Sequence, residues 1–211
     1  MKHPKYSNGK TTRTLVLNTE TTQVWQRKVQ QKTNSDLNTL QYPAVAVVNT
    51  TTFSAARDIF NETNDVCCLN FASAKNPGGG FPKGSQAQEE SFARASGLYS
   101  SLLQAPSYYK ANRRSRRPSG LYEDLIIYSP TVPVFRDDND DLLENPWQTA
   151  IITAPAPNRG AVTKNSPEAL TLIPETFRRR IDMILSTKHF GHRDLVLGAW
   201  VVVYSKMIQM K

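Results

Sequence analysis

Apolar residues occur along this chain in short runs that alternate with amphipathic stretches. The continuous apolar run at residues 44–49 is typical of a strand covered on both faces, and residues 66–71 predict a second buried strand. Further strands are predicted at residues 125–129, 132–135, 149–153 and 194–200. Helical spacing predicts helices over residues 19–32, 53–61, 87–103 and 167–188. This alternation predicts an α/β sandwich around a mixed, mainly parallel sheet.

A glycine-rich segment joins the predicted strand at residues 66–71 to the helix at residues 87–103. It contains Gly78, Gly79 and Gly80, and Gln88-Glu89-Glu90 opens the helix. In open α/β sheets, ligands bind beyond the carboxyl ends of strands. Glycines without Cβ atoms allow successive backbone N–H groups to surround an anion. The segment therefore predicts a phosphate cradle with two glutamates in the first helical turn beside it.

Glu89 and Glu90 have positions on the helix that restrict what they can do together. Adjacent helical residues diverge by about 100°, so we expect that the two carboxylates cannot both flank one glycosidic bond. One of them would protonate a leaving group, and the other would serve a different purpose.

Composition sets the broad class of the protein. An apolar content of 39% and a charged content of 21% are those of an ordinary globular domain. Cys67 and Cys68 are neighbours on a predicted strand, so we expect them to be buried on opposite faces without a disulfide. With three histidines and no further cysteine, we expect no metal site and no cofactor. The first residues lack a secretion signal, which favours the cytosol or nucleus, and we expect no membrane contact.

The net charge of +8 makes an anionic partner plausible, and much of the excess lies in one cluster. This cluster contains Arg113, Arg114, Arg116 and Arg117. It is either a solvated surface loop or a surface for a polyanion, whose affinity would then depend on salt.

The combination of Gly78–Gly80 with Gln88–Glu90 resembles the signature of the microbial-type poly(ADP-ribose) glycohydrolases, which are macrodomain proteins. The resemblance extends over about residues 19–200, with similar segments at residues 69–77, 94–99, 128–136 and 152–158. It implies a macrodomain-like three-layer α/β/α sandwich that binds ADP-ribose and cleaves the ribose–ribose bonds of its polymer. The implied partners are poly(ADP-ribose) or ADP-ribosylated macromolecules.

The resemblance also implies roles for individual residues. Glu90 would be the catalytic acid, and Glu89 would hydrogen-bond the ribose hydroxyls. Gln88 would position the loop and ligand, Asn76 would contact the terminal ribose, and Phe81 would lie at the substrate. A helix N-terminus favours an ionised carboxylate, so we expect Glu90 to hold its proton only when burial and the substrate diphosphate raise its pKa.

The resemblance divides the chain into three parts. Residues 1–42 would form an N-terminal helical extension, residues 43–200 the macrodomain-like catalytic domain, and residues 201–211 an atypical C-terminal tail. Family members follow the strand at residues 194–200 with a second glycine-rich loop, whereas this chain continues with an apolar tail that contains no glycine. We expect either a truncated product or a short natural variant.

Two alternatives to a glycohydrolase follow from these features. One is an ADP-ribose-binding macrodomain with little or no turnover, because its second phosphate loop is missing. The other is a nucleic-acid-binding domain that uses the arginine cluster.

Overall fold

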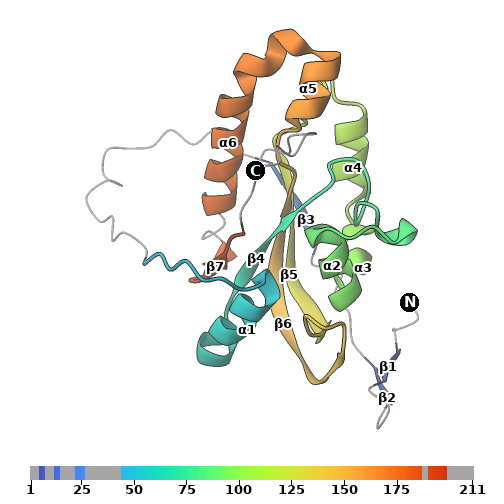
Figure 1. Ribbon diagram of the computed structural model, residues 1–211, viewed down its shortest axis with the longest axis vertical. Helices are drawn as coiled ribbons and strands as arrows, with labels where there is room; N and C mark the ends of the chain where they lie inside the picture. Colours follow the sequence, from blue (N-terminus) through green and yellow to red (C-terminus); the bar gives the residue numbers. More distant parts are fainter. Residues whose placement is uncertain (1–4, 8–11, 15–21, 27–43, 187–189, 199–211) are drawn as a thin grey trace, which may run out of the picture.

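The computed structural model describes residues 5–7, 12–14, 22–26, 44–186 and 190–198 (Figure 1). The strands are β1 Lys5–Ser7, β2 Thr12–Thr14, β3 Gln23–Gln26, β4 Cys67–Phe71, β5 Leu125–Arg136, β6 Leu142–Ala154 and β7 Leu195–Val196. The α-helices are α1 Thr52–Thr63, α2 Gln88–Ala95, α3 Leu98–Leu102, α4 Pro106–Arg113, α5 Arg159–Asn165 and α6 Ile173–Leu185. Two 3₁₀ helices, η2 Phe81–Lys83 and η3 Pro167–Leu172, complete the described elements. None of the described helices is long and apolar enough to span a membrane.

The central sheet has the strand order β3-β5-β6-β4-β7. The pairs β3–β5 and β5–β6 are antiparallel, whereas β6–β4 and β4–β7 are parallel. Among the described strands the sheet is therefore mixed, as expected: β3, β6, β4 and β7 run in one direction, and β5 runs in the other. Phe71 pairs with Ala154 in the β4–β6 register, so both strands end at the same edge of the sheet. β5 runs the other way and begins at that edge.

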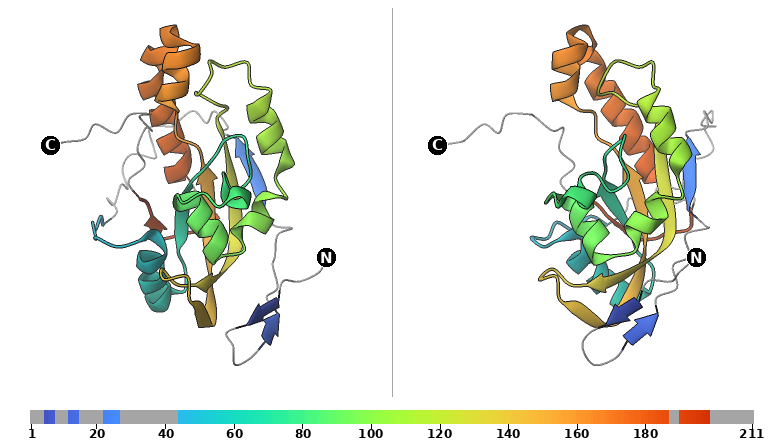
Figure 2. Two further views of the ribbon diagram at one scale, coloured as in Figure 1. Left: turned by 45° about the vertical axis from the view of Figure 1, so that its right-hand side comes forward. Right: turned by 90° about the vertical axis from the view of Figure 1, so that its right-hand side faces the viewer.

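Helices cover both faces of this sheet, which confirms the three-layer α/β/α sandwich. The core on one face gathers residues of α1 to α4 against β4, β5 and β6, and the core on the other face includes Met183 and Ile184 of α6. Figures 1 and 2 show α6 and α4 on opposite sides of the sheet. Cys67 packs in the α6 core and Cys68 in the other, both as buried free thiols, which confirms their predicted placement.

The helix predicted over residues 19–32 is wrong within the described residues. Residues 23–26 form β3, which pairs antiparallel with β5 from Gln23 opposite Tyr128 to Gln26 opposite Leu125. Val24 and Trp25 are the half-buried residues of this strand, and they pack against the two cores on opposite faces of the sheet. Two adjacent apolar residues fit a helical pattern as well as a strand that is covered on both faces. The boundaries of the three predicted parts stay predictions.

The buried strand predicted at residues 44–49 is also wrong. Residues 44–48 have no strand partner in the described structure, and Val45 and Val47 are 85% and 95% exposed. A strand is buried only where neighbouring strands and both flanking layers cover it. An apolar run by itself does not supply these neighbours.

Other elements are confirmed with different boundaries. Residues 66–71 and 149–153 lie in or beside β4 and β6, and the two short strands at residues 125–135 are one strand, β5, with a register shift between Ser129 and Val132. The helix predicted over residues 87–103 divides into α2 and α3 at Ser96, which instead forms a β-bridge with Val134. The helix predicted over residues 167–188 begins as η3 and continues as α6.

The segment that carries β7 is fixed by a partly buried chain of polar contacts. His192 Nδ1 lies 2.6 Å from Asp65 Oδ1, and His192 Nε2 lies 2.7 Å from the Tyr128 hydroxyl. The strand predicted at residues 194–200 is observed only as Leu195–Val196. Residues 199–211, and with them the predicted tail, lie outside the described residues.

Candidate active site

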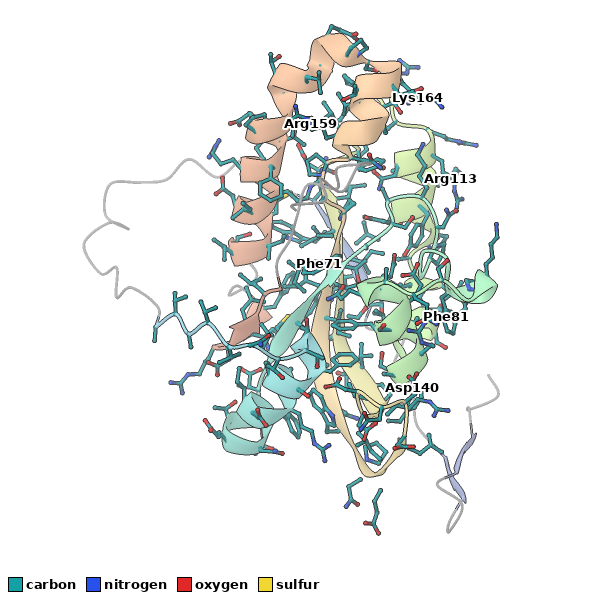
Figure 3. All side chains as sticks on the ribbon, in the orientation of Figure 1. Phe71, Phe81, Arg113, Asp140, Arg159 and Lys164 are labelled. Atoms are coloured by element: carbon teal, nitrogen blue, oxygen red, sulfur yellow. The ribbon has the colours of Figure 1, made fainter. Side chains whose placement is uncertain are left out.

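The candidate site lies where β4 ends and the chain turns through the glycine-rich loop into α2. Phe71, the last residue of β4, and Phe81, the first residue of η2, mark the two sides of this turn (Figure 3). Glu89 and Glu90 stand in the first turn of α2, as predicted, and both are buried. Two adjacent buried carboxylates in the first turn of a helix are costly to maintain, which is typical of a functional site.

The surroundings of Glu89 favour the protonated form of its carboxyl group. Its Oε2 accepts a hydrogen bond of 2.7 Å from the backbone N–H of Ser73, while its Oε1 is buried without a partner among the described residues. Burial raises the pKa of Glu89 to about 8, the negative charge of Glu90 adds to the rise, and the Ser73 N–H opposes it. A carboxyl group with this pKa is largely protonated at neutral pH and can donate a hydrogen bond.

Glu90 is oriented by the loop that faces it. Its Oε1 accepts a hydrogen bond of 2.7 Å from the backbone N–H of Gly80. Its Oε2 is also buried and has no hydrogen-bond partner within the described residues. One oxygen is therefore fixed, and the other remains for a reacting group.

Gly79 allows the loop to lie directly against both glutamates. Its φ is +59°, and a Cβ atom there would lie 2.5 Å from Glu90 Oε1 and 2.9 Å from Glu89 Oε2. The two carboxylates thus converge on one glycine, and the expectation that they diverge is wrong at their tips. Adjacent helical side chains leave the backbone in different directions, but long, flexible glutamates can bend toward the same loop.

The backbone N–H groups of the loop are paired within the protein in this structure. Gly79 N–H donates to the carbonyl of Asn76 at 3.0 Å, and Gly80 N–H donates to Glu90. Phe81 N–H donates to the carbonyl of Gly78 at 2.9 Å. The glycines therefore give the loop a close approach to the carboxylates, and binding of a phosphate by the loop stays a prediction.

Gln88 ties α2 to β4 through its side-chain amide. Its Oε1 accepts from the Phe71 N–H at 2.7 Å, and its Nε2 donates to the Leu69 carbonyl at 2.8 Å. The side chain completes the backbone pairing of β4 much as a neighbouring strand would. This contact fixes the helix that carries both glutamates, and the expected role of Gln88 in positioning the loop and the ligand stays a prediction.

Asn76 and Phe81, the remaining predicted substrate-binding residues, lie on the glycine-rich loop. The Asn76 side chain is exposed, and Phe81 is half-buried against Tyr99 with ring centroids 5.0 Å apart. Tyr99 also limits the space at Gly78, where a Cβ atom would lie 2.8 Å from its ring. Whether Asn76 and Phe81 touch the substrate stays a prediction.

Three supporting residues of the site were not singled out from the sequence. Ser73 holds Glu89 through its backbone, and Tyr99 supports the loop from α3. Asn70 is fully buried on β4, where its Nδ2 donates to Thr153 Oγ1 at 3.1 Å and its amide lowers the pKa of Glu89. A polar asparagine inside a buried strand was the signal in the sequence that could have revealed this last role.

The arginines of the cluster lie in two different environments. Arg117 forms ion pairs with Glu123 and Asp124 at 3.3 Å and 2.9 Å and is half-buried. Arg113, Arg114 and Arg116 are exposed. The fold therefore uses Arg117 internally and presents the other three to solvent.

A three-layer α/β/α fold that closes a glycine loop over two buried glutamates is macrodomain-like. Within this class, the family model described as the microbial-type PARG (poly(ADP-ribose) glycohydrolase) catalytic domain matches residues 2–137. The chain belongs to this family.

Solved structures agree with this assignment. The poly(ADP-ribose) glycohydrolase of Deinococcus radiodurans, solved in complex with ADP-ribose, is 52% identical over 71% of this chain and 60% of its own, with a TM-score of 0.67. The glycohydrolase of Thermomonospora curvata bound to the inhibitor ADP-HPD is 39% identical over 94% of this chain and 74% of its own, with a TM-score of 0.77. A second structure of the latter enzyme is 35% identical over 94% and 75%, with a TM-score of 0.74.

The chain thus spans about 60% of the length of the Deinococcus radiodurans structures that it matches. A comparison with curated protein sequences finds no match.

Proposed function

We propose that this protein hydrolyses the ribose–ribose O-glycosidic bonds of poly(ADP-ribose) and releases ADP-ribose. The observation that carries the proposal is the arrangement of Glu90, whose Oε1 is fixed by Gly80 N–H while its buried Oε2 has no partner among the described residues. Membership in the glycohydrolase family and the similarity to a structure in complex with ADP-ribose support it.

In this mechanism Glu90 acts as general acid and then as general base. Protonated Glu90 donates its proton to the leaving ribose oxygen while the glycosidic C–O bond breaks, and the bonding electron pair leaves with that oxygen. The resulting carboxylate removes a proton from a water molecule whose oxygen bonds to the anomeric carbon. The substrate diphosphate stabilises the positive charge that develops on the ribose.

Glu89 supports the same reaction from the neighbouring position. Its raised pKa keeps it largely protonated at neutral pH, so that it can donate a hydrogen bond to a ribose hydroxyl. It also limits the negative charge beside Glu90.

Substrate binding requires Glu90 Oε2 to become accessible, because this oxygen has almost no solvent exposure in the structure. Gly79 and Gly80 lie against Glu90 Oε1 and Glu89 Oε2, so Gly80 N–H can keep Glu90 in place while the substrate approaches Oε2. Other N–H groups of the glycine-rich loop would then donate to the diphosphate. Asn76 and Phe81 lie on the same loop and would contact the ribose.

The partners of this site would be poly(ADP-ribose) or ADP-ribosylated macromolecules. Exposed Arg113, Arg114 and Arg116 supply non-specific attraction for such polyanions. Arg117 contributes less than its neighbours, because its charge is already paired.

The test is incubation of labelled polymer with the wild-type protein, with Glu90→Gln and with the exposed control Glu62→Gln. We expect the wild type and Glu62→Gln to release ADP-ribose, and Glu90→Gln to release it about 10²–10⁴-fold more slowly while still binding ADP-ribose. Binding of ADP-ribose by the wild type without release would instead identify a binding module. Affinity for nucleic acid with neither binding nor release would refute the proposal.

A further inference from the structure

Charge is distributed unequally between the two ends of the sheet. Three segments surround the edge where β4 and β6 end and β5 begins, and they comprise residues 72–88, 104–122 and 155–167. Together they contain nine Lys and Arg residues and no Asp or Glu. The hairpin between β5 and β6, at the opposite edge, contains Asp137, Asp138, Asp140 and Asp141. Figure 3 shows Arg113, Arg159 and Lys164 toward one end of the molecule and Asp140 toward the other.

Several carboxylates lie directly beyond these segments. Glu89 and Glu90 are buried in the candidate site, and Glu168 is exposed on η3. Glu123 and Asp124 form ion pairs within the fold. Asp124 pairs with Arg117, Arg179 and Arg180, and Glu123 pairs with Arg117. These arginines balance the two acids within the fold. The exposed cations Lys110, Arg113, Arg114, Arg116 and Lys164, which we call the basic face, remain outside these ion pairs.

Arg113 connects this face to the glycine-rich loop. Its Nε donates a hydrogen bond of 2.9 Å to the backbone carbonyl of Lys75, the residue before Asn76. The bond orients an exposed guanidinium at the start of the loop. A guanidinium that is held in place loses less conformational entropy when it binds a phosphate, and its planar N–H groups fit two phosphate oxygens.

The chemistry of this face matches one kind of partner. A polymer of ADP-ribose carries two phosphate charges in each unit, so units beside the one held at Glu90 bring regularly spaced anions. We propose that the basic face binds the diphosphates of these neighbouring units, with Arg113 making the contact nearest to the cleaved bond. This inference rests on the proposed function. Binding of neighbouring units by the basic face would make the protein selective for long polymers over short ones.

The experiment compares Arg113→Gln/Arg114→Gln with the control Arg57→Gln/Arg193→Gln, which removes the same charge from exposed positions on α1 and beside β7. Substrates are a long polymer of defined length and the ADP-ribose dimer, the shortest molecule with the bond to be cleaved. We expect the first variant to raise KM for the long polymer about tenfold, with kcat and dimer hydrolysis nearly unchanged. The slope of log affinity against log salt should decrease by about one for each arginine removed. The control should behave as the wild type.

Several results would overturn this inference. Equal losses on dimer and polymer would show that Arg113 acts within the catalytic site, and an unchanged KM for the polymer would show that the face is not used. Duplex DNA that competes as well as the polymer, charge for charge, would identify a general nucleic-acid surface. Dimer hydrolysis by the wild type tests the proposed function separately. If it is absent, polymer binding measured by fluorescence anisotropy still tests the basic face.

Discussion

At the scale of single residues, Gly79 is where backbone conformation and the two glutamates meet. An alanine at this position would combine a φ of +59° with close contacts to both carboxylates. We expect Gly79→Ala to destabilise the protein by about 1–3 kcal/mol and to reduce polymer hydrolysis about 100-fold, because it displaces the carboxylates. Urea unfolding and hydrolysis assays measure the two effects.

Gly84 provides the matched control for this substitution. Its φ is +75°, but nothing lies within 4 Å of a Cβ atom placed there. Gly84→Ala should cost about 1 kcal/mol through backbone strain alone and leave hydrolysis unchanged. Equal loss of hydrolysis in both variants would contradict the role given to the contact at Gly79.

Because Glu89 is buried, we expect it to make the folded protein less stable as the pH rises. Burial raises its pKa from 4.5 to about 8, so the folded protein keeps a proton that the unfolded chain releases in this window. The contribution of Glu89 to stability is therefore fully present below about pH 4.5 and is lost as the pH rises toward about 8. The amide of Glu89→Gln does not titrate in this range, so the variant lacks this pH-dependent contribution to stability.

The measurement is the free energy of unfolding in urea at about pH 5 and about pH 9 for the wild type and Glu89→Gln. We expect the wild type to lose about 2–4 kcal/mol more than the variant between the two conditions. Glu62→Gln, at an exposed position on α1, should follow the wild type. If the wild type and Glu89→Gln show the same pH dependence, Glu89 is not a buried, protonated group.

At the scale of elements, Gln88 determines how α2 sits on β4. Its amide makes two hydrogen bonds with the backbone of that strand, to Phe71 N–H and the Leu69 carbonyl. Gln88→Met keeps the length of the side chain but removes both bonds. We expect it to cost about 1–3 kcal/mol in urea unfolding and to slow polymer hydrolysis, because α2 carries both glutamates.

The exposed Gln104 offers a control on a neighbouring segment. Gln104→Met should change neither stability nor hydrolysis by a measurable amount. If Gln88→Met were as stable and active as Gln104→Met, the amide would not be what holds α2 in place.

At the scale of the whole molecule, Arg180 joins three distant parts of the chain. It is fully buried on α6, and its guanidinium donates to the carbonyls of Pro155, Leu121 and Glu123 and pairs with Asp124. It therefore anchors the loop after β6 and the segment before β5 at the same edge as the glycine-rich loop.

Arg180→Met should destabilise the protein by about 3–5 kcal/mol, because it leaves Asp124 and several buried carbonyls with fewer partners. Arg178, on the same helix, is 61% exposed and pairs with Glu175 and Asp182. Arg178→Met should cost no more than about 1 kcal/mol. Thermal and urea unfolding measure the loss of stability in each variant. Similar losses in Arg180→Met and Arg178→Met would contradict the anchoring role of Arg180.

The sequence by itself determined the order of the site: a buried strand, a glycine-rich loop, and a helix that opens with Gln88, Glu89 and Glu90. It also determined the opposite faces of Cys67 and Cys68. These features depend on residue chemistry and on local periodicity, which the order of amino acids records directly.

Only the tertiary structure decided which segments acquire partners. Residues 23–26 became an edge strand because β5 was there to pair with them, while residues 44–48 stayed exposed without a partner. The convergence of Glu89 and Glu90 on Gly79, the raised pKa of Glu89 and the internal pairing of Arg117 were decided in the same way. Each depends on burial and contacts between segments that are distant in sequence, and no local pattern encodes them.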